Sequence, residues 1–220
     1  MKGTVSAVST ALRSALWGLF PLWGRQPLIA RRLRAISRSP ANWIRYSRGA
    51  DSAAYAPTGS NAQNLLVSVV DDIAAMDALR EAVYLRLDEL AETGAMPDCQ
   101  RRAFFLSAGK LWKAGGWDGI FRSAPHCVIV ANAKNATCVE QDPLIYLSYF
   151  ELMAQARGIG TLWCGLLYWC LRDVLPDFLP RLGIPDTHQL GYAMLFGYPS
   201  INYRRTVETR SALVRHIGWN

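Results

Sequence analysis

Polar side chains that could hold a cofactor are concentrated in one short turn. Thr58, Ser60, Asn61 and Gln63 place two hydroxyls and two amides directly before an apolar run. These groups both donate and accept hydrogen bonds, so they suit the ribityl chain and the ring edge of a flavin. Taken alone, the segment is also compatible with an ordinary polar turn.

Two further segments could complete such a site. Gly158, Gly160 and Thr161 follow an apolar run, and their small side chains allow a ligand to approach backbone N–H groups that stabilise negative charge. Arg204 and Arg205 follow the last apolar run and could neutralise a phosphate. Taken alone, the first is a helix C-cap and the second a pair of surface charges.

Other kinds of site have no pattern in this chain. The histidines, His126, His188 and His216, lie far apart and have no metal-ligand spacing. The sequence has no nucleophile elbow, no phosphate-binding lysine loop and no dinucleotide fingerprint. We therefore expect no metal site and no catalytic side chain, because a cofactor would carry the reaction. The five cysteines include no C-x-x-C pair, so they lack the usual spacing of iron–sulfur and structural zinc sites. Their odd number favours reduced thiols and a cytoplasmic protein over a secreted disulfide framework.

Apolar patterns and the turn residues that bound them predict the helices and strands that position these segments. Buried strands are expected over 65–70, 127–132 and 191–197. Helices are expected from Asp71 and Asp72 to about residue 92, over about 99–114 and over about 166–175. A further helix begins at Asp142, as N-cap before Pro143, and stops at Gly158. It is apolar almost all round, so we expect it to be covered on several sides, as at a subunit interface.

Charge divides the chain into two parts. Residues 1–50 hold nine of the 24 Lys and Arg residues and none of the 17 acidic ones. Residues 51–220 form the expected folded domain. Because the basic excess lies outside that domain and no recognition motif is present, we expect no nucleic-acid partner. The basic, aromatic arm at 1–50 could wrap a partner subunit, make peripheral contact with a membrane, or act as a targeting segment. No run is long enough to span a membrane.

Three blocks in this order resemble the nitroreductase superfamily. They are residues 55–63 (YAPTGSNAQ), the run from Asp142 to Gly165 that contains GIGT, and the C-terminal blocks 182–185, 195–199 and 203–205. Their form is most similar to the branch that often carries a ferredoxin domain, although no ferredoxin-type cysteine motif is present here.

The resemblance implies an α+β fold with a central, mostly antiparallel sheet flanked by helices, in an intertwined homodimer with FMN at its interface. The implied reaction passes a hydride from NADH or NADPH through flavin N5 to a nitroaromatic, quinone or similar small-molecule acceptor. The implied cofactor contacts are Pro57, Thr58, Ser60, Asn61, Gln63, Gly158, Gly160, Thr161, Leu162, Arg204 and Arg205.

One family element is altered. The family's R-R-S-x-R motif has its counterpart in Arg31 and Arg34, but the serine is missing and the segment up to Ala54 is weakly patterned. Two alternatives to the main interpretation follow. One is a non-catalytic or weakly flavin-binding dimer that acts through its basic N-terminus. The other is a specialised flavin enzyme, such as a reductive dehalogenase, distinguished by its acceptor-contacting segment at 95–125.

Overall fold

A computed structural model describes residues 36–37, 53, 55–200 and 213–219 of the chain. Its centre is an antiparallel sheet with the strand order β1-β5-β3-β2, and β4 also pairs with β5. The strands are β1 (Ile36–Ser37), β2 (Leu65–Val70), β3 (His126–Ala133), β4 (Gly160–Trp163) and β5 (His188–Pro199). The expected α+β fold with a central antiparallel sheet is confirmed.

The strand register fixes which loops share an end of the sheet. Leu65 pairs with Asn132, and Asn132 pairs with Gln189, so the start of β2 lies at the start of β5. Gly160 pairs with Gly197 at the other end of β5. The polar turn before β2 and the glycine turn before β4 therefore lie at opposite ends of the sheet.

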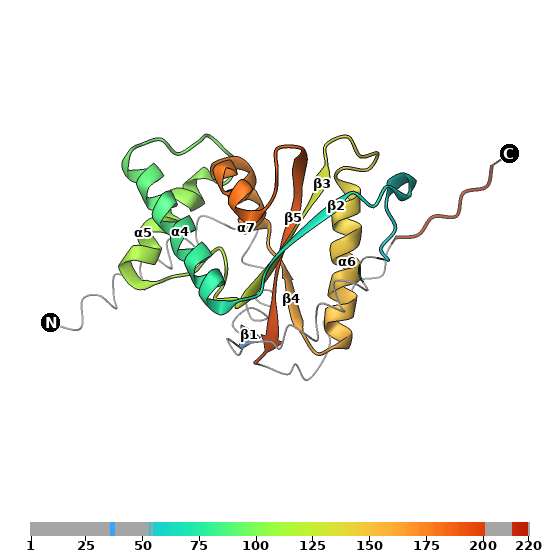
Figure 1. Cartoon of the computed structure of the whole chain (residues 1–220), viewed down its shortest axis with the longest axis horizontal. Helices are drawn as coiled ribbons and strands as arrows, with labels where there is room; N and C mark the ends of the chain where they lie inside the picture. The colour runs from blue at the N-terminus through green and yellow to red at the C-terminus, as the bar shows by residue number, and fades with distance from the viewer. Residues whose placement is uncertain (1–35, 38–52, 54, 201–212, 220) are drawn as a thin grey trace.

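Helices cover both faces of this sheet (Figure 1). One face carries three helices, α4 (Ile73–Glu92), α5 (Arg102–Gly115) and α7 (Gly165–Trp169), and the other carries α6 (Gln141–Ala156). α7 continues as a π-helical turn, η3 (Cys170–Val174). Short 3-10 turns are η2 (Gly59–Asn61), η4 (Pro176–Phe178) and η5 (Pro180–Leu182).

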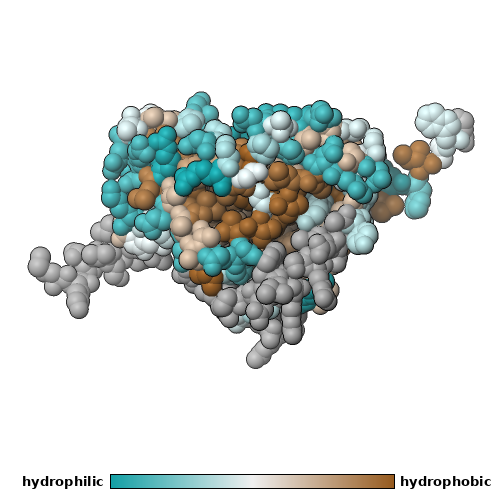
Figure 2. All heavy atoms as spheres, in the orientation of Figure 1, coloured by the Kyte–Doolittle hydropathy of each residue, from teal (hydrophilic) through white to brown (hydrophobic). Residues whose placement is uncertain are grey.

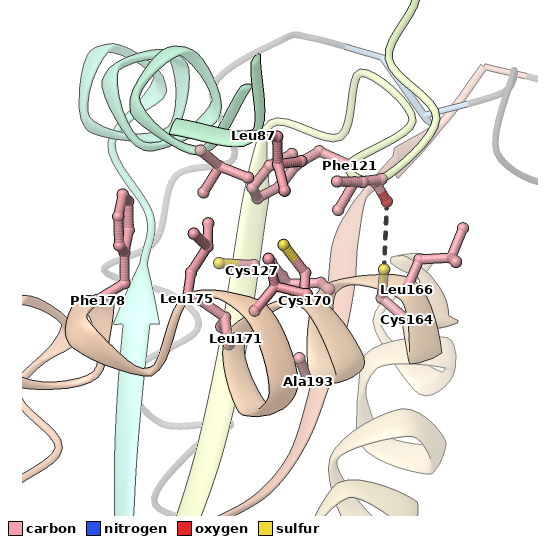
Figure 3. Packing of buried hydrophobic residues seen from close by; sticks show 14 of the residues in the cluster. Leu87, Phe121, Cys127, Cys164, Leu166, Cys170, Leu171, Leu175, Phe178 and Ala193 are labelled. Atoms are coloured by element: carbon pink, nitrogen blue, oxygen red, sulfur yellow. Dashed lines mark hydrogen bonds between the residues drawn. The ribbon is translucent and has the colours of Figure 1, made fainter. Parts of the chain in front are cut away.

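Two hydrophobic clusters follow from strand alternation, since successive side chains point to opposite faces. In β3, Cys127 and Ile129 join the cluster beneath α4, α5 and α7, whereas Val128 and Val130 join the cluster beneath α6. Figure 3 shows the first cluster, in which the thiols of Cys127, Cys164 and Cys170 lie among aliphatic and aromatic side chains. Burial raises the pKa of the Cys127 thiol to about 12, so this thiol is a core residue and not a nucleophile.

Local sequence signals account for several boundaries. Asp72 caps α4, because its carboxylate accepts a hydrogen bond of 2.8 Å from the backbone N–H of Ala75. α5 ends where Gly116 adopts a positive φ of 65°. The helices expected at 71–92, 99–114 and 166–175 and the strands expected at 65–70, 127–132 and 191–197 are all present, with ends shifted by a few residues.

Two local expectations were wrong. Gly160–Trp163 is a strand and not only a turn, because it extends the sheet along β5. α6 begins at Gln141, and Asp142 lies inside its first turn. Asp142 does not cap this helix, because its carboxylate accepts a hydrogen bond from the backbone N–H of Gly59 in the polar turn before β2.

Candidate functional site

The polar turn before β2 is fixed to the start of α6. The buried carboxylate of Asp142 accepts a hydrogen bond of 3.0 Å from the backbone N–H of Gly59. Its second oxygen lies 3.4 Å from the side-chain amide of Asn132, which also donates to the carbonyl of Cys138 at 3.2 Å. A carboxylate in the first turn of a helix is further stabilised by the helix dipole. The turn is therefore attached to both β3 and α6.

Close packing explains the glycine in this turn. A Cβ at Gly59 would lie 2.6 Å from Sγ of Cys138 and 2.8 Å from its Cβ. After Gly59 the backbone adopts positive φ at Ser60, Asn61 and Gln63, with values of 54°, 53° and 51°. Three positive φ values outside glycine in one short turn are uncommon, and such strain is typical of ligand-binding loops.

The side chains of this turn remain available to a ligand. Ser60, Asn61 and Gln63 are exposed, and Pro57 is exposed as well. Thr58 shapes the turn itself, because its hydroxyl accepts a hydrogen bond of 3.0 Å from the backbone N–H of Gln63. The amide of Gln63 lies 3.4 Å from Oδ1 of Asn61. The structure thus brings together all five residues that the sequence assigned to this loop.

The second group of candidate residues follows α6. Gly158 has a φ of 72°, and Gly160 opens β4. The Thr161 and Leu162 side chains point to opposite faces of the sheet, since Leu162 packs against the cluster under α4 and α5. The Thr161 hydroxyl donates instead to Glu151 of α6 at 3.1 Å. Glu151 also accepts a hydrogen bond of 2.8 Å from the indole of Trp163.

Within one chain the two groups do not meet. Gly59 lies at the first turn of α6, and Gly158 follows its last turn. A helix of 16 residues is roughly 24 Å long, so the polar turn and the glycine turn are separated by about that distance. A ligand that contacts both groups must take one from each of two chains.

The four candidate arginines, Arg31, Arg34, Arg204 and Arg205, lie outside the described residues. The nearest described residues are Ile36 and Ser200. Ile36 pairs with Pro199 at the end of β5. Gly160 lies at this end too, since a Cβ added at Gly160 would lie 3.8 Å from Cβ of Pro199.

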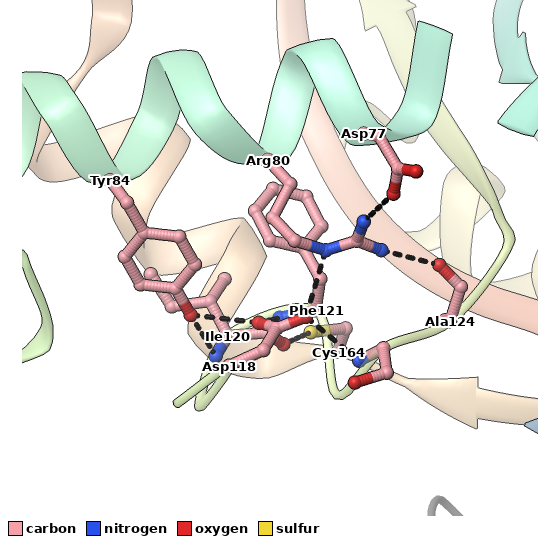
Figure 4. A network of polar contacts seen from close by, with 9 residues as sticks. Asp77, Arg80, Tyr84, Asp118, Ile120, Phe121, Ala124 and Cys164 are labelled. Carbon is pink, nitrogen blue, oxygen red and sulfur yellow. Dashed lines mark hydrogen bonds and ion pairs between the residues drawn. The ribbon is translucent and has the colours of Figure 1, made fainter. Parts of the chain in front are cut away.

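A buried polar network organises the loop between α5 and β3 (Figure 4). Asp118 accepts a hydrogen bond of 2.9 Å from Arg80 and one of 2.8 Å from the Tyr84 hydroxyl. Arg80 also pairs with Asp77 and donates to the carbonyl of Ala124 at 2.7 Å. Burial, followed by the charge of Asp118, raises the pKa of Tyr84 well above its usual value. Tyr84 therefore stays a neutral donor.

The aromatic residues of this region pack in the core. Trp112 stacks on Tyr84 with a centroid distance of 4.7 Å, and Trp117 lies 6.1 Å from Phe104. Phe121 is fully buried. These contacts give the 95–125 segment a packing role at Trp112, Trp117 and Phe121.

Four contributors to these sites escaped sequence reasoning: Asn132, Asp142, Glu151 and Asp118. Asp142 was interpreted as a helix cap, because its position directly before Pro143 fits a cap as well as it fits the contact with Gly59. Glu151 carried a usable signal, because it is a lone acid in the apolar middle of α6. Asn132 and Asp118 carried none, since their partners are distant in sequence.

The described residues form an α+β domain with a central antiparallel sheet and an exposed polar turn at its edge. The model of the nitroreductase family matches residues 46–198, and the chain belongs to this family. No curated protein matches the sequence.

Solved structures share the fold. A nitroreductase from Bacteroides fragilis with bound FMN is 19% identical, covers 83% of this chain and 92% of its own, and has a TM-score of 0.63. Iodotyrosine deiodinase bound to FMN and 3-iodo-L-tyrosine is 18% identical, covers 84% and 94%, and has a TM-score of 0.55. An FMN-dependent nitroreductase from Mycobacterium smegmatis in complex with NADPH is 20% identical, covers 77% and 87%, and has a TM-score of 0.53.

The described residues contain neither a membrane-spanning helix nor a cluster of metal ligands. In the part of the chain that the structure describes, no helix is long and apolar enough to cross a membrane. Across the same residues, no three metal-ligating side chains gather closely enough to hold an ion.

Proposed function

We propose that the protein is an FMN-dependent oxidoreductase that takes a hydride from NADPH or NADH and delivers it to a small acceptor such as a nitroaromatic or a quinone. The observation that carries the proposal is the strained, exposed polar turn at 57–63, tied down by Asp142. Family membership and FMN-bound structures of the same fold support it. NADPH in one of those structures supports the donor.

The residues of the turn fit a flavin. Ser60, Asn61 and Gln63 offer exposed hydroxyl and amide groups for the ribityl chain and the polar ring edge. Backbone N–H groups near Gly158 and Gly160 can approach the ring closely because no Cβ stands in the way. Arg31, Arg34, Arg204 and Arg205 would hold the phosphate. Bound FMN would supply the redox chemistry, and these residues bind and orient it.

The proposed site requires a homodimer. The polar turn and the glycine turn lie at opposite ends of α6 in one chain, so a second copy must supply one of them. α6 presents apolar side chains for such contact, since Leu144 is 41%, Tyr149 40% and Leu152 68% exposed. A large exposed apolar face is costly in water and is typical of an interface.

A second surface supports an intertwined dimer. Among the described strands β2 is an outer one, paired with β3 alone. Apolar atoms gather in the middle of the face in Figure 2, where β2 crosses in Figure 1. The C-terminal segment 213–219 is fully exposed and carries Leu213, Ile217 and Trp219 at 89%, 84% and 96% exposure. We propose that this segment of one copy covers apolar surface of the other.

The first experiment is the visible spectrum of the purified full-length protein, followed by anaerobic addition of NADPH or NADH. A bound-flavin band that bleaches supports the proposal. A protein that binds no FMN even after incubation with it would overturn the proposal and favour the non-catalytic dimer acting through residues 1–50. A flavin that bleaches only with a chemical reductant, and that then removes a halogen from a haloaromatic, would favour the dehalogenase alternative, as iodotyrosine deiodinase suggests.

The dimer is tested separately by sedimentation of the wild type and of Leu152→Arg. A charge at an exposed apolar interface position should dissociate the dimer and weaken FMN binding together. A monomeric wild type that binds FMN with normal affinity would contradict the shared site.

A further inference from the structure

The half-buried Glu151 of α6 directs its carboxylate at β4, the strand that follows the glycine turn. One carboxylate oxygen accepts a hydrogen bond of 3.1 Å from the Thr161 hydroxyl, and the other accepts one of 2.8 Å from the indole N–H of Trp163. Thr161 and Trp163 are alternate residues of β4, so both side chains point to the α6 face of the sheet. Glu151 therefore holds β4 at two points from one side.

The charge of Glu151 is not neutralised by any described side chain. Both of its hydrogen-bond donors are uncharged, and Glu151 forms no ion pair with a described cation. Arg157, the nearest cation in sequence, is exposed after the end of α6. Placing an unpaired carboxylate in a partly buried position costs more than placing an amide there. A carboxylate at this position is therefore a poor choice if its only task is to accept two hydrogen bonds.

The strand that Glu151 holds has backbone donors on an unpaired edge. The N–H of Cys164 donates to the carbonyl of Ala193 in β5 at 2.9 Å. Backbone groups alternate in direction along an antiparallel strand, so the N–H groups of Thr161 and Trp163 point away from β5. Among the described strands β4 pairs with β5 alone, so its other edge is open beside the glycine turn. Glu151 thus fixes the two residues whose N–H groups face the open edge.

We propose that Glu151 is a positioning residue that lowers the reduction potential of the bound flavin. The inference rests on the proposed FMN function, in which the glycine turn and β4 lie along the flavin ring. Glu151 holds Thr161 and Trp163, and so keeps the open edge of β4 in place for the ring. Reduction adds negative charge to a flavin ring, and the unneutralised carboxylate behind β4 opposes this addition.

The test is the reduction potential of bound FMN in the full-length protein. It is measured by equilibration with a redox dye and a chemical reductant, so that no nicotinamide is needed. Glu151→Gln removes the charge and keeps an acceptor oxygen. It should shift the two-electron equilibrium toward reduced FMN by about tenfold, which corresponds to a rise of about 30 mV. Glu81→Gln makes the same change at an exposed acid of α4, on the other face of the sheet, and should leave the potential unchanged.

A merely structural Glu151 predicts a different outcome. A strand that has lost its support would bind oxidised and reduced FMN less tightly by the same factor, so Tm and affinity would fall while the potential stayed constant. Glu151→Asp separates the two roles, because it keeps the charge and shortens the side chain. It should lower Tm and keep a potential close to that of the wild type. A rise of about 30 mV for Glu151→Asp would overturn the proposal, even if Glu151→Gln did not fold.

Failure of this proposal can be distinguished from failure of the proposed function. An unchanged potential for Glu151→Gln, or an equal rise for Glu81→Gln, overturns the role of Glu151 alone. A wild type that binds no FMN after incubation with it overturns both. A wild type whose bound FMN is not reduced by NADPH or NADH contradicts the proposed donor only, since the chemical reductant still measures the effect of Glu151.

Discussion

The carboxylate of Asp142, in the first turn of α6, accepts a 3.0 Å hydrogen bond from the backbone N–H of Gly59, 83 residues earlier in the chain. This contact joins the polar turn to the helix whose far end leads into the glycine turn. In each chain the polar turn and the glycine turn are thereby attached to opposite ends of one helix, and in the proposed dimer the two turns of one chain belong to different cofactor sites. Disturbing the Asp142 contact should therefore affect cofactor binding without touching the cofactor.

Replacing Asp142 with alanine tests this attachment. The change leaves the N–H of Gly59 without its acceptor and deprives the Asn132 amide of one partner. An unsatisfied buried polar group costs about 1–3 kcal/mol. We expect Asp142→Ala to lower the free energy of unfolding by about that amount in urea titrations and to weaken FMN binding. Asp186→Asn, at an exposed acid, is the matched control, and equal effects of the two changes would contradict the prediction.

A methyl group at Gly59 should displace the same turn. The added Cβ would meet Cys138 at 2.6 Å from Sγ and 3.3 Å from the backbone nitrogen, so the turn has to move. Overpacking of this kind costs typically about 1–3 kcal/mol. We expect Gly59→Ala to reduce both Tm and FMN affinity, measured by scanning fluorimetry and by flavin fluorescence.

The control for that change is Gly115→Ala. A Cβ at Gly115 meets nothing within 4 Å, and the residue lies at the end of α5, where alanine is the better helix former. This variant should be as stable as the wild type or slightly more so, with unchanged flavin binding. If Gly59→Ala behaved in the same way, the close packing against Cys138 would be irrelevant to the site.

Much of the fold could be predicted from local sequence patterns, because the signals that specify a strand, a helix start or a turn lie within a few residues. The β-branched run of β2 correctly predicted a strand, although this outer strand is half-buried and not buried as expected, and Asp72 correctly marked the start of α4. The polar turn was also assigned correctly as one unit. These assignments depend on alternation, capping and turn chemistry, which a short segment determines alone.

The remainder depended on contacts between distant segments. Nothing near Asp142 in sequence shows that it faces Gly59 and not its own helix end. β4 was missed as a strand because its four residues form one only by pairing with β5. The distance between the polar turn and the glycine turn, about the length of α6, could likewise be predicted only from the register of the whole sheet. Pattern reasoning cannot supply such pairings, since they depend on tertiary structure.

Glu151 should be a structural link that matters for the β4 end of the site. Its carboxylate accepts from both the Thr161 hydroxyl and the Trp163 indole, at 3.1 and 2.8 Å. Glu151→Leu removes both acceptors and should lower stability by about 1–3 kcal/mol in urea titrations. Glu151→Gln keeps an acceptor oxygen and should lose less than half as much. If Glu151→Gln were as damaging as Glu151→Leu, the negative charge would matter more than the two hydrogen bonds.

The buried His126 predicts loss of stability at mildly acidic pH. Both ring nitrogens are buried, neither meets the geometric criteria for a hydrogen bond with a described residue, and the ring lies 5.3 Å from that of Phe196. Burial lowers the pKa of His126 from its ordinary value of 6.5, and the nearby Asp71 and Asp72 only partly oppose this. Well above pH 6.5 the ring is neutral in both the folded and the unfolded chain, so its contribution to stability is constant.

Below that pH the unfolded chain binds the proton first, so stability is lost as pH falls toward the pKa of the folded state. His126→Phe removes this titration and should flatten the dependence of Tm on pH between about 6.5 and 5, without the acid loss of the wild type. His188→Gln, at a half-exposed histidine that contacts the Thr187 hydroxyl at 3.0 Å, serves as the control. Tm profiles that fall in parallel for the wild type and His126→Phe would show that other groups control the acid sensitivity, whereas a flattened profile for His126→Phe alone assigns it to this ring.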